Sequence, residues 1–132
     1  MRRAETGLAY FTLAFVAVFA PLETLYSWPY GLASPYYLVD VIAIGLMFAG
    51  AWRSLRVRPT AAPALMTVGW AWAGANFWRA TLARQAELRS GGKLDYGATE
   101  LSLAIATTAV AMACVAIGTW MIVRRRDAGL GG

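Results

Sequence analysis

Four stretches of mostly apolar residues follow one another along the chain, separated by short segments that contain polar residues, glycine or proline. They cover approximately residues 7–26, 35–55, 61–89 and 97–123. A helix needs about 20 apolar residues to cross the hydrocarbon core of a bilayer, and each stretch reaches about that length. The pattern predicts an all-α integral membrane protein, a four-helix up-down-up-down transmembrane bundle, with residues 1–132 forming a single transmembrane domain.

Residues at the ends of these stretches are typical of helix boundaries. Ser34 followed by Pro35 predicts an N-cap and a first helical residue. Gly91 predicts the end of the third helix, and the fourth is expected to end at Val123. Pro21 lies inside the first stretch, where it removes one backbone hydrogen bond and is expected to kink the helix.

The first stretch has two interpretations. The segment Leu8–Ala20 also has the length of a signal-peptide core, and Arg2 and Arg3 supply the basic flank. However, Pro21 would directly follow the cleavage position, where its fixed ring fits a signal peptidase poorly, and apolar residues continue beyond it. We therefore expect this segment to remain as the first membrane helix.

Composition supports the membrane interpretation. Hydrophobic residues make up 59% of the chain and charged residues 14%, against about a quarter in a soluble domain. The mean hydropathy is +0.51. A net charge of +5 would suggest nucleic-acid binding in a soluble protein, but the basic residues lie in short clusters beside apolar stretches. We therefore expect the lipid bilayer as a partner and no nucleic acid.

Residue types exclude several kinds of chemistry. The chain has no histidine and one cysteine, Cys114. His-ligated haem or zinc, Ser-His or Cys-His catalysis, an intramolecular disulfide and a CxxC pair are therefore excluded. There is also no GxSxG, Walker or HExxH motif. The sequence predicts a protein that is not an enzyme, with no catalytic residues, no cofactor and no metal site.

The distribution of Lys and Arg predicts the orientation. With four crossings, one side of the membrane receives eight of the twelve Lys and Arg residues, which lie at the N-terminus, in the second loop and at the C-terminus. Cytoplasmic loops carry the excess of positive charge. We therefore expect a multi-pass protein of the inner or plasma membrane with both termini in the cytoplasm.

Small residues recur at the spacing of close helix contacts. Gly45 with Ala49, and Gly69 with Ala73, fit the small-xxx-small pattern. Packing within the chain and a dimer interface both remain open.

Ionisable and amide side chains interrupt the apolar stretches near the predicted outer face. They come from all four helices and are expected at a similar depth: Glu23, Asp40, Asn76, Arg79 and Glu100. Such residues usually face the bundle and pair with one another, so Arg79 is expected to reach one or two carboxylates, with Asn76 adding a hydrogen bond. Three carboxylates exceed one Arg, and the excess requires a proton, a bound cation, water or Arg84.

Aromatic residues concentrate on the same predicted side. Those expected to flank the polar residues are Trp72, Trp78, Tyr36 and Tyr37. Trp72 shares a helical face with Asn76 and Arg79, whereas Trp70 points to another face. A simple interfacial belt of aromatic rings and a binding site for a ligand are both compatible with this pattern.

Two kinds of function remain. The first is a non-enzymatic accessory, assembly or ligand-binding component of a larger membrane system, acting with another membrane protein or as a homo-oligomer. In it, the polar residues either hold the bundle together or form a ligand site. The alternative is a small oligomeric transporter or channel that is coupled to protons or cations through its intramembrane carboxylates. A transporter needs polar residues down to the inner side, where mainly threonines occur.

Overall fold

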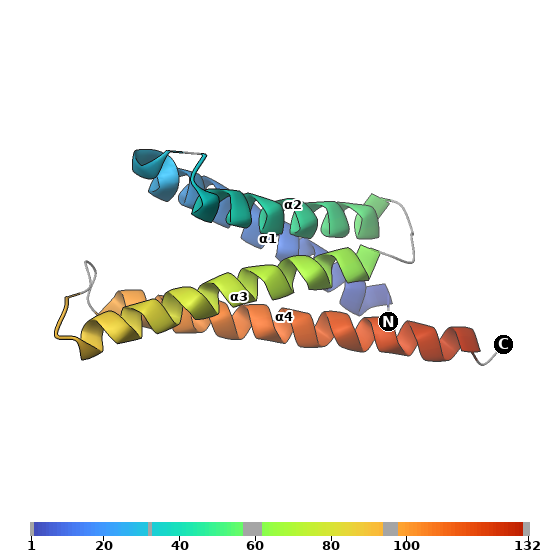
Figure 1. Cartoon of the computed structure of the whole chain (residues 1–132). Coiled ribbons are helices and arrows are strands. Elements are labelled where there is room, and N and C mark those ends of the chain that lie inside the picture. Colours follow the sequence, from blue (N-terminus) through green and yellow to red (C-terminus); the bar gives the residue numbers. More distant parts are fainter. Residues whose placement is uncertain (1, 32, 57–61, 94–97, 131–132) are drawn as a thin grey trace.

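Four α-helices account for almost all of the described chain. The computed structural model describes residues 2–31, 33–56, 62–93 and 98–130. The helices are α1 (Arg2–Ser27), α2 (Pro35–Arg56), α3 (Ala62–Arg89) and α4 (Ala98–Leu130), and a short 3-10 turn, η1 (Trp28–Tyr30), follows α1 (Figure 1). The predicted all-α class is confirmed.

Three of the helices are long and apolar enough to cross a membrane. The segments with this property in the described chain are Arg3–Ser27, Tyr37–Arg56 and Thr99–Arg126. The prediction of four such helices therefore holds for three, and α3 differs. Its apolar part is interrupted by Asn76 and Arg79, and its last two turns are largely polar.

The helices extend further than the apolar stretches. α1 begins at Arg2 and continues through Pro21, and α4 passes Val123 and ends at Leu130. Arg is a good helix former, so the three arginines after Val123 end the apolar segment without ending the helix.

Two predicted helix boundaries are confirmed. The Tyr37 N–H donates to Ser34 Oγ at 3.3 Å, which caps the start of α2. At the end of α3, Gly91 has a φ of 80°, and the Gly92 N–H donates to the Glu87 carbonyl at 2.9 Å. This is the hydrogen-bond pattern of a Schellman cap, in which the left-handed residue is usually glycine.

Glycines allow α3 to approach both of its neighbours closely. A Cβ at Gly69 would lie 2.8 Å from the Met47 backbone nitrogen of α2, and a Cβ at Gly50 would lie 2.5 Å from the Met66 nitrogen of α3. On the other side of α3, a Cβ at Gly118 of α4 would collide with the Thr67 hydroxyl. α3 is therefore packed between α2 and α4.

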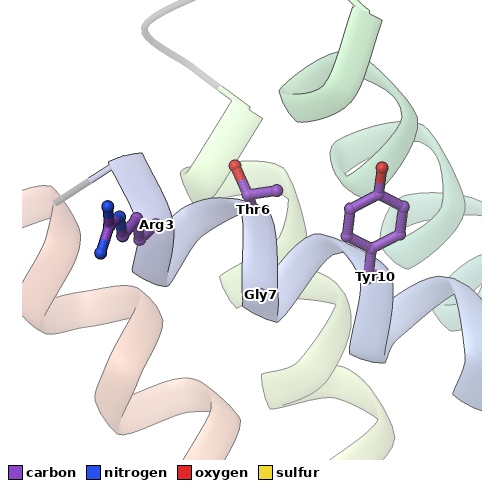
Figure 2. A pocket seen from close by; sticks show the side chains of 4 residues that line it. All are labelled: Arg3, Thr6, Gly7 and Tyr10. Carbon is purple, nitrogen blue, oxygen red and sulfur yellow. The ribbon is translucent and has the colours of Figure 1, made fainter.

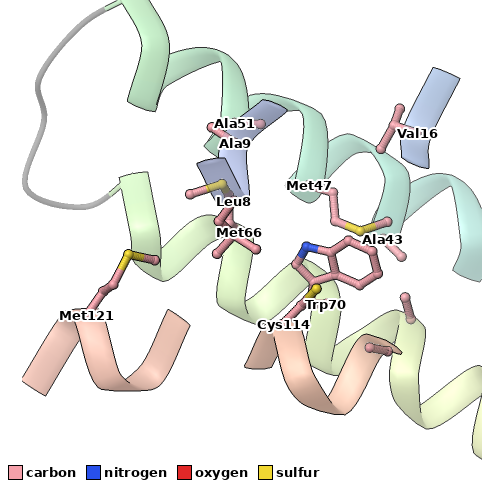
Figure 3. Close-up of a cluster of buried hydrophobic side chains, with 12 residues drawn as sticks. Leu8, Ala9, Val16, Ala43, Met47, Ala51, Met66, Trp70, Cys114 and Met121 are labelled. Atoms are coloured by element: carbon pink, nitrogen blue, oxygen red, sulfur yellow. The ribbon is translucent and has the colours of Figure 1, made fainter. Parts of the chain in front are cut away.

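Trp70 is the centre of the core. This α3 side chain is fully buried, its Nε1–H donates to Thr12 Oγ1 at 2.9 Å, and its ring lies 4.7 Å from that of Phe15. Figure 3 shows it among residues from the other three helices. The buried apolar core consists of Leu8, Ala9, Val16, Ala43, Met47, Ala51, Met66, Trp70, Ala73, Ala111, Cys114 and Met121.

The helix bundle has two ends. We call "η1 end" the end at which α1 stops, α2 starts and α3 turns toward α4. We call "terminus end" the opposite one, at which α1 starts and α4 stops (Figure 1).

Candidate functional site

The centre of the candidate site is a hydrogen bond between α2 and α3 near the η1 end. Asp40 is the sixth residue of α2 and is half-buried. Asn76 Nδ2 donates to Asp40 Oδ1 at 3.2 Å. The α2–α3 contact at Gly69 lies two turns of α3 before Asn76, so close helix packing brings the amide within reach of the carboxylate.

Two further charged residues lie around Asp40. Glu23 of α1 is beside it, and Arg79 of α3 interacts with it electrostatically. Glu23 also accepts a hydrogen bond from Ser27 Oγ at 3.2 Å. These residues bring α1, α2 and α3 together, and we call Glu23, Asp40, Asn76 and Arg79 the Asp40 cluster.

A second polar contact joins α1 to α2 next to this cluster. Thr24 Oγ1 and the Tyr37 hydroxyl lie 3.0 Å apart. The Thr24 hydroxyl donates its proton to the Ala20 carbonyl at 2.8 Å, so the Tyr37 hydroxyl is the donor between them. Tyr37 therefore has a structural partner, which its place in the sequence did not reveal.

Glu100 lies apart from the other four predicted residues. It forms an ion pair with Arg84 between α4 and α3, with Nε and Oε1 2.6 Å apart. Arg84 is eight residues beyond Asn76, which corresponds to about 12 Å along α3. The five residues were expected at one depth, but Glu100 lies at a different level from Asp40 and Asn76. The reason is that α3 and α4 both continue past the level at which α2 begins (Figure 1).

The predicted flanking aromatics differ in exposure. Trp72 and Trp78 are 42% and 56% exposed, whereas Trp70 is the tryptophan that α3 buries. The Tyr36 side chain lies outside the described part of the chain. Of the four aromatics, only Tyr37 has a described polar contact with the helices around Asp40.

A polar network at the terminus end was missed by sequence reasoning. Arg125 of α4 forms an ion pair with Glu5 of α1, and Ser54 of α2 donates to the same carboxylate at 3.1 Å. The ion pair joins residues 120 positions apart. Only their shared location beside apolar stretches, on one predicted side of the membrane, could have suggested the contact.

Two tryptophan–arginine pairs lie at that end. Arg56 lies 4.4 Å over the Trp52 ring in α2, and Arg124 lies 5.8 Å over the Trp120 ring in α4. The two tryptophans are at one level, since Gly50 and Gly118, each two residues before them, contact neighbouring residues of α3. Such pairs combine an apolar ring with a charge, as interfacial residues do.

The chemistry available to the Asp40 cluster is polar binding. It has two carboxyl groups, one guanidinium and one amide, so its ionised form carries one excess negative charge. Within the described residues, no group of three His, Cys, Asp or Glu side chains could hold a metal ion. Comparison of the chain with known protein families, curated protein sequences and solved structures finds no match.

Proposed function

We propose that the chain is a four-span membrane protein, with α3 as the fourth span and the η1 end outside the cytoplasm. α3 lies between α2 and α4, and two polar side chains in its second half are paired with protein. Asn76 donates to Asp40, and the buried Thr81 hydroxyl donates to the Phe77 carbonyl. A helix of this kind can lie in a bilayer although its sequence is less apolar, because these two polar groups are bonded to protein. Its exposed charged residues, Arg79, Glu87 and Arg89, all lie toward the η1 end.

Its proposed role is that of a non-enzymatic accessory component of a larger membrane system, which binds a positively charged group at the Asp40 cluster. The observation that carries this proposal is a half-buried carboxylate inside an apolar helix. Asp40 accepts a hydrogen bond from one amide, interacts with one guanidinium, and lies beside a second carboxylate, Glu23. The excess negative charge favours a cation, an amine or a basic side chain of a partner subunit.

The distribution of buried polar groups favours one-sided binding over a path through the membrane. The buried polar residues of the described chain are Thr12, Ser27, Thr81 and Thr108. Only Thr12 lies between the Asp40 cluster and the terminus end, and its hydroxyl is engaged by the Leu8 carbonyl and the Trp70 indole. The core at this depth offers a proton or ion no other polar side chain.

Asp40→Asn tests the proposal. The variant keeps the shape of the side chain and an acceptor for Asn76, but removes the charge. We expect sodium, calcium or ethylammonium, added at constant ionic strength, to raise the melting temperature of the detergent-purified wild type. A ligand at about 100 times its Kd stabilises by about 2.7 kcal/mol. Asp40→Asn should lose this response and keep the helical content of the wild type.

Glu87→Gln is the matched control, since Glu87 is an exposed acid of α3 outside the cluster, and it should respond like the wild type. An equal response in the wild type and Asp40→Asn would contradict a binding role and leave a structural one. In liposomes with a proton or cation gradient, no flux above protein-free vesicles is expected. Flux that is abolished by Asp40→Asn would instead establish the transporter alternative.

A further inference from the structure

A hollow on α1 at the terminus end is independent of the Asp40 cluster. Its volume is about 610 Å³, and the described residues that line it are Arg3, Thr6, Gly7 and Tyr10. Figure 2 shows the hydroxyl oxygens of Thr6 and Tyr10 on the same side of α1, with Arg3 one turn before Thr6. The floor at Gly7 is open, because a Cβ there would meet no atom within 4 Å.

This hollow faces away from the helix bundle. At 3.6 residues per turn, its lining residues lie on the face of α1 opposite to Leu8, Thr12 and Val16, which are buried in the core. Tyr10 itself is 63% exposed. In a membrane helix, the face that turns away from the bundle meets lipid, so the hollow is accessible to a lipid rather than enclosed by protein.

The charge at this end leaves Arg3 available. Glu5 is already bound by Arg125 and Ser54, and no other described carboxylate forms an ion pair with a residue of α1. A guanidinium and two hydroxyls are all donors that suit the oxygens of a phosphate group. Their depth also fits a headgroup. Glu5 and Arg125 form an ion pair and so lie at one level. Tyr10 is five residues from Glu5 and Trp120 is five residues from Arg125, so Tyr10 lies at about the level of Trp120, a ring of the interfacial kind.

The same face of α1 continues with small residues toward the η1 end. Ala14, Ala17 and Pro21 follow Tyr10 on this face, and all three are exposed. Because these side chains are small, there is room for a straight acyl chain beside the helix. We propose that this face of α1 binds one anionic phospholipid, with its phosphate at Arg3, Thr6 and Tyr10 and one chain along Ala14 and Ala17.

The site relies on α1 being a membrane helix and not on the Asp40 cluster. A cation response that persists in Asp40→Asn therefore does not contradict the lipid site. Likewise, failure of the lipid proposal leaves the Asp40 proposal unaffected.

Gly7→Leu tests the proposal directly, since a Cβ at this position meets no atom within 4 Å and the longer side chain occupies part of the hollow. The full chain is purified in detergent with either phosphatidylglycerol or phosphatidylcholine of the same acyl chains, and the bound lipid is measured by native mass spectrometry. We expect the wild type to retain phosphatidylglycerol preferentially. Arg3→Gln should lose about fivefold in affinity, as expected for one basic residue at a lipid surface, and Gly7→Leu at least as much.

The controls separate this site from general attraction to basic residues. Gly45→Leu makes the same change on α2 at a glycine with equally open space, and Arg126→Gln removes an exposed charge at the same end. Gly45→Leu should retain lipid like the wild type, and Arg126→Gln should lose less lipid than Arg3→Gln, because neither residue lines the hollow. The melting temperature of Gly7→Leu should not fall, and Tyr10→Phe should show a smaller loss of lipid than Arg3→Gln.

Three results would overturn the proposal. In the first, Gly7→Leu and Arg3→Gln retain phosphatidylglycerol like the wild type. In the second, inorganic phosphate displaces the lipid and binds equally well alone, so that the hollow takes a free anion. In the third, Gly7→Leu changes a dimer into a monomer with no change in bound lipid, which would make this face an interface between two copies.

Discussion

Gly69→Leu is expected to separate α2 from α3 and to be among the most destabilising single changes in the protein. A Cβ at Gly69 would lie 2.8 Å from the Met47 backbone nitrogen and 2.7 Å from its Cγ. Overpacking costs about 1–3 kcal/mol where side chains can adjust. Here the obstacle includes backbone, so α2 itself must move, and we expect a loss at or above the upper end of that range.

The measurement is thermal unfolding of the purified protein in detergent, followed by circular dichroism. Gly45→Leu is the matched control, because a Cβ at Gly45 of α2 meets no atom within 4 Å. Its melting temperature should stay the same or rise, as glycine is a poor residue inside a helix. Equal melting temperatures for the two variants would mean that α2 and α3 do not pack as described.

Trp70→Ala is the second change with a large expected effect. The indole is fully buried and contacts the rings of Phe11 and Phe15 at centroid distances of 5.9 and 4.7 Å. Truncation of a buried Trp to Ala costs about 3–5 kcal/mol, since it leaves a large cavity. Because Trp70 connects α3 to α1, the loss should appear as a lower melting temperature and as increased protease cleavage between helices.

The hydrogen bond of Trp70 has a separate test. Thr12→Val removes the acceptor at 2.9 Å and leaves the buried indole N–H without it, at a cost of about 1–3 kcal/mol. Trp72→Ala is the control, because Trp72 is 42% exposed and should matter much less. A larger loss for Trp72→Ala than for Trp70→Ala would contradict the described core.

Local sequence signals predicted the start of α2 and the end of α3. Ser34 acts through its side-chain oxygen and Gly91 through its backbone conformation. Neither effect depends on the packing of distant helices. Which glycines contact a neighbouring helix could not be predicted from the sequence. The small-residue spacing marked Gly45 and Gly69 equally, but only Gly69 meets a neighbouring backbone, since the spacing does not show which face a partner helix covers.

The sequence predicted which residues would form polar contacts inside the helix bundle, but not how all of them are arranged. The sequence placed Asp40 and Asn76 near one another, and the structure joins them by a hydrogen bond. It also placed Glu100 at their depth, assuming that all helices start and stop at the same two planes. In the structure, α3 and α4 extend beyond the start of α2 at the η1 end (Figure 1), and Glu100 pairs there with Arg84.

We propose that α3 crosses the membrane, although it is not among the three described helices that are apolar enough to do so by themselves. The most direct measurement places a reporter that is active only outside the cytoplasm after Gly31, Arg56 or Gly92, and at the C-terminus. We expect activity after Gly31 and Gly92 and none at the other two positions. Activity at the C-terminus together with none after Gly92 would contradict it, because the chain would then cross the membrane three times with α3 on the cytoplasmic side.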